Sequence, residues 1–320
     1  MGSVQSPYPP GIHVPSLTWF KPDATQTIDW DLQEKHLEFL IRSGIHGIVI
    51  AGTNGEAATL TPEEKSKLVR LTRSTAQKLN QSSLPITCGT FGGCTQAIIQ
   101  DTKLAADAGA DYALVLVPSY FHFALDATAI VEFFQDVASA SPVPVVIYNF
   151  PGVASGLNVT SEMLETLGDH PNIVAVKLTC GTIASVARTA AKFGTALDGD
   201  RRFVALAGQS DWLVPCLTIG GAGSVTGLAN LYPKACMEIF NLHNSGKRAE
   251  AEKLQIQLAV AEWGFGKGGI NGTKWVVAKY LGYPEDSACC RRPYPKFIDE
   301  EKRAWITKQV NGLQVIEQGL

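Results

Sequence analysis

The chain has 320 residues, a length that suits one large domain with an appendage or two modest domains. Hydrophobic residues make up 45% of it and charged residues only 18%, so a core can form and a disordered chain is excluded. The formal net charge of −3 gives no electrostatic reason to expect binding to nucleic acid or to an anionic membrane. These values predict a soluble, compact and enzymatic chain.

The cysteines and the first residues indicate the cellular compartment in which the protein is expected. Seven cysteines show no CxxC motif and no framework spacing, which predicts reduced thiols inside a cell. The first residues, MGSVQSPYPPG, lack a basic segment followed by an apolar stretch, so we expect no signal peptide. The sequence contains no run of eighteen apolar residues, so we expect no membrane span. Together these features predict a cytoplasmic protein.

Short runs rich in β-branched residues alternate with amphipathic segments along the chain. Each run is apolar almost throughout, which is typical of parallel strands covered on both faces. The expected strands cover residues 12–17, 47–51, 85–89, 112–117, 143–148, 173–178, 203–207 and 223–225. The expected helices between them cover residues 32–43, 62–79, 95–108, 126–138, 161–167, 182–193 and 211–219. One helix start is well marked, because Thr61, Pro62 and Glu64 form the pattern of a capping box.

The spacing of these elements decides between two folds. The strands recur about every thirty residues, the size of a βα unit, and eight of them fit within about 240 residues. They predict an α/β protein, either a closed (β/α)8 TIM barrel or an open doubly wound sheet. No dinucleotide-binding fingerprint follows the first strand, so the barrel is favoured. We expect the barrel in residues 1–245 and a C-terminal appendage in residues 246–320, with three helices at 248–265, 272–281 and 299–316.

In a barrel of this kind, functional residues gather where the strands end. The second expected strand is followed by Gly52-Thr53-Asn54-Gly55-Glu56. Glycines on both sides of the Thr-Asn pair let backbone N–H groups approach an anion, with a hydroxyl and an amide beside them. The same residue types are common in ordinary βα turns, so this segment alone leaves both interpretations open.

Two tyrosines are expected at the same end of the barrel. Tyr120 follows the fourth strand, and Tyr148 ends the fifth. A single tyrosine at a strand end is more often a packing residue with one polar tip than a catalyst. Two of them beside the Thr53 hydroxyl could instead form a proton relay.

Lys177 lies in the expected strand 173–178, which is otherwise apolar. Such a lysine has to be paired, functional or extended from the strand end to water, because lysine is almost never fully buried alone. Burial disfavours a charged ammonium, and a neutral amine is a nucleophile toward carbonyl carbon. The position within a barrel strand favours the functional interpretation.

Two other kinds of site are not supported. The run 264–269 fits the pattern GxGxxG, but it follows an expected helix instead of a strand and so lacks the context of a dinucleotide site. The six histidines show none of the usual metal-binding spacings. We therefore expect neither a catalytic metal nor another cofactor.

In their order and spacing, the motifs resemble those of the dihydrodipicolinate synthase/N-acetylneuraminate lyase superfamily. The matching motifs are the run 52–56, Pro118 with Tyr120, Tyr148-Asn149-Phe150-Pro151, Lys177, and Leu206-Ala207-Gly208-Gln209-Ser210-Asp211. The resemblance extends from about residue 13 to about residue 295. It implies a TIM barrel with C-terminal helices, class I aldolase chemistry on a pyruvate-derived Schiff base, no cofactor, and a homo-oligomer, dimer or tetramer.

The resemblance also implies a role for each site residue. Lys177 would form the Schiff base, and Tyr148 would be the acid and base that exchanges protons with the substrate. Thr53 and Tyr120 would link Tyr148 to solvent, with Tyr120 usually supplied in this family by a neighbouring subunit. The implied substrate-binding residues, which hold the pyruvate part, are Thr53, Asn54, Gly208 and Val225.

This chemistry agrees with elementary reactivity. An imine on Lys177 makes C2 of the substrate an electron sink, so the C3–C4 bond can break to give an enamine and an aldehyde. The departing aldehyde requires a base that removes the proton of the C4 hydroxyl. A phenol holds its proton at neutral pH, so Tyr148 would need the hydroxyls of Thr53 and Tyr120 as neighbours.

The segment after the fifth strand bears on the substrate. Dihydrodipicolinate synthases carry an arginine shortly after the corresponding motif, whereas residues 152–156 here read Gly-Val-Ala-Ser-Gly. Asn54, where those synthases have a second threonine, is similar to 4-hydroxy-2-oxoglutarate aldolases and to fungal aldolases. The stretches YNFPGVASG and KLTCG resemble fungal 2-keto-3-deoxy-L-galactonate (L-threo-3-deoxy-hexulosonate) aldolases, which release pyruvate and L-glyceraldehyde in the breakdown of pectin sugars. We expect the same cleavage here.

Three alternatives remain open. A 4-hydroxy-2-oxoglutarate aldolase releases glyoxylate and would need a cationic or donor-rich pocket for the second carboxylate. A dihydrodipicolinate synthase is disfavoured by the missing arginine, although Arg291 or Arg292 would change this expectation if either reached the pocket. A non-enzymatic 2-oxo acid sensor would need the carboxylate cradle but not the tyrosine relay.

Overall fold

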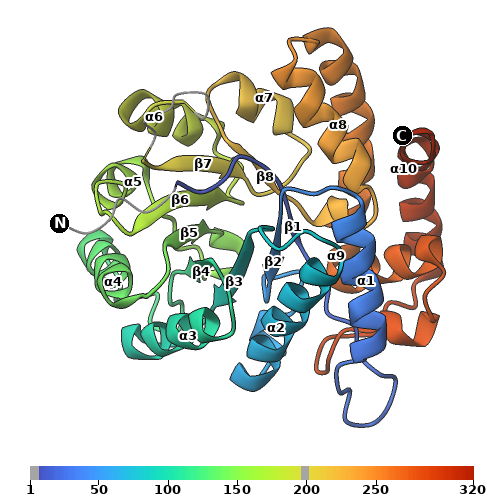
Figure 1. Cartoon of the computed structure of the whole chain (residues 1–320), viewed down its shortest axis with the longest axis horizontal. Coiled ribbons are helices and arrows are strands. Elements are labelled where there is room, and N and C mark those ends of the chain that lie inside the picture. The colour runs from blue at the N-terminus through green and yellow to red at the C-terminus, as the bar shows by residue number, and fades with distance from the viewer. Residues whose placement is uncertain (1–6, 196–201) are drawn as a thin grey trace.

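The computed structural model describes residues 7–195 and 202–320, and its centre is a closed barrel of eight parallel strands. Each strand pairs with the next one along the chain, and β8 pairs with β1 to close the sheet (Figure 1). The strands are β1 (Gly11–Pro15), β2 (Gly47–Ile50), β3 (Ile86–Thr90), β4 (Tyr112–Leu116), β5 (Val145–Asn149), β6 (Ile173–Leu178), β7 (Val204–Ala207) and β8 (Gly223–Val225). All eight expected strands are present, so the predicted TIM barrel is confirmed.

Helices surround the barrel and follow the strands in turn (Figure 1). They are α1 (Trp30–Arg42), α2 (Pro62–Lys78), α3 (Thr95–Asp107), α4 (Ala127–Ala140), α5 (Ser161–Leu167), α6 (Ile183–Phe193), α7 (Leu213–Thr218) and α8 (Pro233–Asn244). The first seven match the expected segments, whereas α8 was missed by the sequence analysis. Its N-cap, Tyr232, makes no side-chain capping hydrogen bond, but Pro233 at its first position is a helix-start signal that the prediction overlooked.

The start of α2 is capped as its sequence predicts. The Thr61 hydroxyl accepts a hydrogen bond from the backbone N–H of Glu64 at 3.2 Å, and the Glu64 carboxylate accepts one from the N–H of Thr61 at 3.0 Å. This capping box satisfies donors that a helix start leaves free. It fixes the point at which the chain leaves the turn after β2.

Alternating residues of the strands face the inside of the barrel or the surrounding helices. In β6, Ala175 packs in the inner cluster, while Val176 and Leu178 pack in an outer cluster with residues of α4, α5 and α6. The inner cluster also contains Tyr8, which comes just before β1. Lys177, two residues after Ala175, therefore lies on the inner side of the strand.

The C-terminal region differs from the three helices that the sequence predicts. The expected helices 248–265 and 272–281 form one element, α9 (Arg248–Leu281), which bends at Gly269. Gly269 has φ 66° and ψ −169°, a conformation available almost only to glycine, and helical hydrogen bonding resumes after it. A short turn, η4 (Glu285–Ala288), and α10 (Glu300–Gly319) follow, and both α9 and α10 pack against α8 (Figure 1).

The described part of the chain contains no helix that is both long and apolar enough to cross a bilayer. The expected division at 245/246 falls in the turn between α8 and α9 and stays a prediction. Three short 3₁₀ turns follow strands and shape one end of the barrel: η1 (Ala57–Thr59), η2 (Pro151–Val153) and η3 (Gly227–Asn230).

Candidate active site

A cavity of about 330 Å³ lies between the carboxyl ends of the strands and α9. From the barrel and its loops it is lined by Thr53, Asn54, Tyr148, Phe150, Lys177, Thr179, Gly208, Gln209, Asp211, Gly227 and Leu228. From α9 it is lined by Glu262, Trp263, Phe265, Gly266, Gly269, Ile270 and Thr273. The cavity thus gathers residues from opposite ends of the sequence at the barrel end where this fold usually places its active sites.

Lys177 and Tyr148 are neighbours in the lining of this cavity. They are paired in register across β5 and β6, so their side chains emerge side by side on the inner face. The Lys177 Nζ lies 4.2 Å from the centre of the Tyr148 ring, and the two residues are only 3% and 1% exposed. The amine therefore faces the cavity from an otherwise apolar strand and does not extend to bulk water.

The Tyr148 hydroxyl lies 3.0 Å from the Thr53 hydroxyl, within hydrogen-bond distance. Thr53 lies in the turn after β2, where Ala51 and Glu56 both adopt positive φ angles, 54° and 58°. Residues other than glycine rarely adopt this conformation, and such strain concentrates at functional sites. The unusual turn is what brings the Thr53 side chain to the tyrosine.

The same turn presents backbone donors to the cavity. Within the described part of the chain, the N–H groups of Thr53 and Asn54 donate no hydrogen bond. Gly227 fits closely against Asn54, since a Cβ at that glycine would lie 2.5 Å from the Asn54 Nδ2. The two free N–H groups are suited to an anionic ligand.

Gly208 lies at the end of β7 and packs against Thr179. A Cβ at Gly208 would lie only 2.1 Å from the Thr179 Oγ1, so a larger residue would displace the Thr179 side chain. Thr179 Oγ1 is itself buried without a hydrogen-bond partner within the described ranges. An unsatisfied hydroxyl at a cavity wall is a candidate partner for a bound ligand.

Two of the predicted site residues are not brought into the cavity. Val225 is 1% exposed and packs in the inner cluster of the barrel, outside the cavity lining. Tyr120 is 79% exposed and stacks edge-to-face on Phe121 at a centroid distance of 5.0 Å. Within a single chain, Tyr120 therefore does not line the site of Tyr148.

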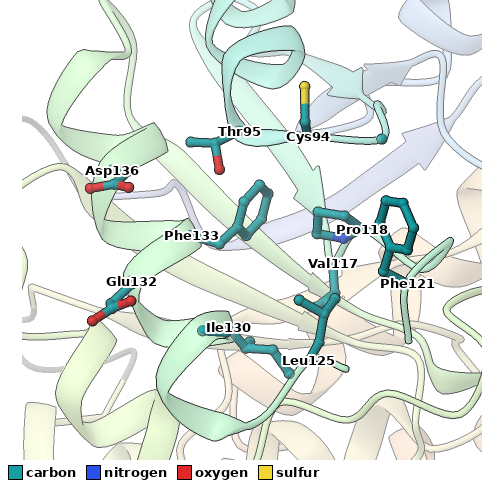
Figure 2. Close-up of a pocket in the computed structure, with 12 residues that line it drawn as sticks. Cys94, Thr95, Val117, Pro118, Phe121, Leu125, Ile130, Glu132, Phe133 and Asp136 are labelled. Atoms are coloured by element: carbon teal, nitrogen blue, oxygen red, sulfur yellow. The ribbon is translucent and has the colours of Figure 1, made fainter. Parts of the chain in front are cut away.

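A second cavity, of about 270 Å³, lies beside the loop that carries Tyr120 (Figure 2). Figure 2 shows apolar side chains around it, among them Val117, Pro118, Phe121 and Phe133, with Cys94 and Thr95 at the start of α3 on one side. The carboxylates of Glu132 and Asp136 lie on α4 at its edge. This hollow is mainly apolar and separate in its lining from the cavity that holds Lys177.

Two acidic residues, Glu262 and Asp211, line the cavity that holds Lys177. Burial, reinforced by the nearby Asp211 carboxylate, raises the pKa of Glu262 to about 7, against hydrogen bonds from Ser210 and Thr226 that lower it. Burial also raises the pKa of Asp211 above its usual value. Asp211 belongs to a motif that is recognisable in the sequence, whereas Glu262 was not predicted, because no local pattern in α9 marks it.

The two arginines that bear on the substrate are engaged away from this cavity. The Arg291 guanidinium binds both carboxylate oxygens of Glu64, at 2.7 and 2.8 Å, and the carbonyl of Gln26. Arg292 donates its backbone N–H to the Gln26 side chain at 2.8 Å and its guanidinium to the Ala24 carbonyl. Among the described lining residues, Lys177 is consequently the only cation.

The described ranges contain no group of three or more histidine, cysteine or acidic side chains that could hold a metal ion. The groups that the cavity does offer are a buried amine, a phenol bonded to a hydroxyl, and free backbone N–H donors. These are the parts of an amine-based carbonyl chemistry. A TIM barrel with a buried lysine amine at the carboxyl ends of its strands is typical of the class I aldolases.

The chain belongs to the dihydrodipicolinate synthetase family, whose model matches residues 9–311. It is 38% identical over 298 residues, 93% of each chain, to the "Probable 4-hydroxy-2-oxoglutarate aldolase, mitochondrial" of Emericella nidulans. It is 36% identical over 314 residues, 98% of each chain, to the "L-threo-3-deoxy-hexylosonate aldolase" of Hypocrea jecorina. The predicted family and the predicted enzyme class, a carbon–carbon lyase, are thereby confirmed.

Solved structures agree with this assignment. A dihydrodipicolinate synthase family protein from Coccidioides immitis matches with a TM-score of 0.86 and 34% identity, over 99% of this chain and 100% of that one. A dihydrodipicolinate synthase from Bacillus anthracis matches with a TM-score of 0.81 and 26% identity, over 97% of this chain. The similarity therefore includes the C-terminal helices as well as the barrel.

Proposed function

We propose that the protein cleaves 2-keto-3-deoxy-L-galactonate to pyruvate and L-glyceraldehyde through a Schiff base on Lys177. The acidity of the cavity carries this proposal: among the described lining residues, Lys177 is the single basic side chain and is itself the reacting amine, while Asp211 and Glu262 are acidic. A substrate with one carboxylate and several hydroxyls suits such a lining. A second carboxylate would face acidic groups without an arginine to bind it.

The first half of the reaction takes place at Lys177 Nζ. The unprotonated form of the amine adds to the C2 carbonyl, and the carbinolamine hydroxyl leaves as water with the phenol proton of Tyr148, so that an iminium and a phenolate result. The iminium draws electrons from the C3–C4 bond while the phenolate takes the proton of the C4 hydroxyl, and the aldehyde leaves. The enamine then takes a proton at C3, and water releases pyruvate and restores the amine.

The geometry supports these roles by proximity. Tyr148 is adjacent to Lys177 in register, so one bound substrate reaches both. The Thr53 hydroxyl is placed to exchange a proton with the Tyr148 hydroxyl at 3.0 Å. The free N–H groups of Thr53 and Asn54 are candidates for binding the pyruvate carboxylate, and Gly208 lines the same cavity.

We assign the aldehyde half of the substrate to the region of the cavity near α9. Gln209 and Asp211 line it, and both provide acceptors for hydroxyl groups. The unpartnered Thr179 hydroxyl adds one more polar group at the wall. Ser155, which is exposed and does not line the cavity, has no part in this assignment.

We infer that the protein acts as a homo-oligomer, dimer or tetramer, in which Tyr120 of one subunit completes the relay of another. Tyr120, Phe121 and Phe123 are 79%, 56% and 78% exposed, an unusual group of aromatic side chains on one loop. The apolar hollow of Figure 2 adjoins them. Association of two copies would bury these rings and would bring Tyr120 to a site it does not reach alone.

The second candidate is 4-hydroxy-2-oxoglutarate aldolase, which the name of the Emericella nidulans relative favours. Its product glyoxylate carries a second carboxylate, which the acidic half of the cavity does not suit. We place the reaction in cytoplasmic carbohydrate catabolism, although that relative is named as mitochondrial. A cleavage assay with both substrates decides between the two candidate functions.

The test compares both substrates under identical conditions. We expect kcat/KM for cleavage of the 2-keto-3-deoxy-hexonate to exceed that for 4-hydroxy-2-oxoglutarate by at least about tenfold, or about 1.4 kcal/mol of discrimination. Condensation of pyruvate with aspartate semialdehyde should be negligible. A preference for 4-hydroxy-2-oxoglutarate would overturn the proposed substrate.

Trapping experiments test the chemistry separately from the substrate. Borohydride with pyruvate should inactivate the protein and add a pyruvate-derived mass to the peptide that contains Lys177. EDTA should leave the activity unchanged, since the amine does the work that a metal does in a class II aldolase. An adduct elsewhere would contradict the role of Lys177.

A further inference from the structure

We propose that Glu262 is a positioning residue that joins α9 to the ends of β7 and β8 and so holds the wall of the aldehyde half of the cavity. The inference rests on the proposed function, because it assigns that wall to the aldehyde. It adds a residue of the C-terminal helices to the machinery of the site. Glu262 acts in this proposal through its neighbours and not by contact with the reacting atoms.

The Glu262 carboxylate connects the segments that follow two neighbouring strands, β7 and β8. Its Oε2 accepts hydrogen bonds from the backbone N–H of Ser210 at 2.6 Å and from the Ser210 hydroxyl. Its Oε1 accepts one from the Thr226 hydroxyl at 3.2 Å. The hydroxyls of Ser210 and Thr226 lie 2.9 Å apart, so the three side chains form a closed network.

A second residue of α9 supports the same segment. Gln255 precedes Glu262 by seven residues, two helical turns, and therefore lies on the same face. Its amide donates to the Ser210 carbonyl at 2.8 Å and accepts from the Val214 N–H at 2.8 Å. The N–H and the C=O of Ser210 are thus both held by α9.

The residues held in this way flank the residues that line the cavity. Gln209 and Asp211 lie on either side of Ser210, and both line the cavity wall. Thr226 precedes Gly227 and Leu228, which line the cavity from η3 after β8, and its hydroxyl also accepts from the Leu228 N–H at 3.2 Å. Moving the Glu262 carboxylate would consequently move both parts of the wall.

The cost of burying this carboxylate indicates a specific requirement for it. Glu262 is 7% exposed, and no cation lies among its hydrogen-bond partners in the described ranges. An apolar residue would avoid the cost of burying a charge but would leave the Ser210 N–H without an acceptor. The raised pKa of Glu262 is consistent with this cost, since burial is its largest cause.

The pyruvate half of the site lies outside this network. Within the described part of the chain, Lys177, Tyr148 and Thr53 have no hydrogen bond to Glu262, Ser210 or Thr226. A positioning role for Glu262 therefore predicts that its loss impairs binding of the complete substrate while Schiff-base formation with pyruvate continues. A residue that only stabilised the fold would affect both alike.

The experiment compares Glu262→Ala and Glu262→Gln with Glu252→Gln, an exposed acidic residue of the same helix that serves as control. For Glu262→Ala, we expect the KM for the 2-keto-3-deoxy-hexonate to rise at least about tenfold while pyruvate trapping by borohydride stays within about twofold. Glu262→Gln keeps an oxygen for the Ser210 N–H, so its KM should stay within about threefold of the wild type. Glu252→Gln should match the wild type in every assay.

Hydrogen exchange provides a readout that does not depend on the reaction. Amides in the peptide around Ser210 should exchange faster in Glu262→Ala than in the wild type or in Glu252→Gln. If Glu262→Ala does not fold, Thr226→Val takes its place, since it removes one donor to the carboxylate with little change in shape. The same split between KM and pyruvate trapping is expected for it.

The outcomes separate this proposal from the proposed function. Unchanged KM and unchanged exchange in Glu262→Ala would overturn the positioning role, and so would an equal loss of trapping and cleavage. A wild-type protein that traps no pyruvate would instead refute the proposed chemistry. In that case the exchange measurement alone decides whether Glu262 positions the wall.

Discussion

The Nζ of Lys274 lies 2.8 Å from the Oε1 of Glu56, and the two side chains are 0% and 2% exposed. Lys274 also donates to the carbonyl of Cys289 at 2.8 Å, and the second oxygen of Glu56 accepts from the Arg291 N–H at 2.8 Å. Glu56 ends the strained turn that carries Thr53. This buried ion pair thus joins α9 and the loop after it to the turn that faces the cavity.

Replacing Lys274 by methionine should strongly destabilise the protein. The change leaves the Glu56 carboxylate buried without its cation, and breaking a buried pair in this way costs about 3–5 kcal/mol. The free energy of unfolding, measured with urea, gives the comparison. Lys253→Met, at an exposed cation of the same helix, is the control and should change stability by less than about 0.5 kcal/mol.

The double variant Lys274→Met/Glu56→Gln refines this test. Because it removes the unpaired charge as well, it should be more stable than Lys274→Met alone. Equal stability of Lys274→Met and Lys253→Met would show that the pair contributes nothing to the fold.

Tyr148→Phe should reduce kcat by about 10²–10⁴-fold, the usual effect of losing a general acid–base group. Thr53→Val should reduce kcat less, because water can partly replace a relay member. Tyr112→Phe is a matched control, since Tyr112 is also buried in the barrel but lies outside the cavity lining. Steady-state cleavage assays measure all three, and a wild-type kcat in Tyr148→Phe would mean that its hydroxyl only packs.

The strands could be predicted because each is a short apolar run between polar segments, a local pattern that survives folding. Lys177 stood out for the same reason, as a charged residue inside such a run. Its register with Tyr148 could not be derived from sequence alone, because pairing of neighbouring strands is a property of the closed barrel. The helix α8 was missed although Pro233 at its first position is a helix-start signal.

The contributions of α9 lay beyond sequence reasoning for a different reason. Glu262 contacts Thr226, 36 positions away, and Lys274 contacts Glu56, 218 positions away, and no spacing within the helix reveals such partners. The position of the Tyr120 side chain also could not be predicted from the sequence. Its motif was recognisable, but the exposed position of its side chain depends on a loop that packs little against the rest of the chain.

Mixing subunits tests the role of Tyr120 across an interface. Lys177→Met should be inactive, and Tyr120→Phe should have a kcat lowered by roughly tenfold, a smaller loss than for Tyr148→Phe. When the two variants are unfolded and refolded together, mixed oligomers contain sites with Lys177 from one subunit and Tyr120 from the other. We expect the activity per Tyr120→Phe subunit to rise in the mixture, whereas refolding with a Tyr120→Phe/Lys177→Met double variant should give no rise.

The pKa of Glu262, raised from 4.5 to about 7, predicts a specific dependence of stability on pH. The charged and titratable groups near it are Asp211, which raises the pKa, and the Cys236 thiol, whose own pKa is raised by burial and by Glu262. Between pH 4.5 and 7 the folded protein retains a proton on Glu262 that the unfolded chain releases. Stability from this group is therefore complete at low pH and is lost as the pH rises through about 7.

Glu262→Gln removes this titration while it keeps the side chain's shape. The free energy of unfolding of the wild type should increase relative to that of Glu262→Gln by on the order of 2–3 kcal/mol as the pH falls from about 8 to about 5. Other ionisable groups are common to both proteins, so their effects cancel in the difference. Urea unfolding at a series of pH values measures it, and a difference that does not vary with pH would mean that Glu262 is ionised in the folded protein throughout this range.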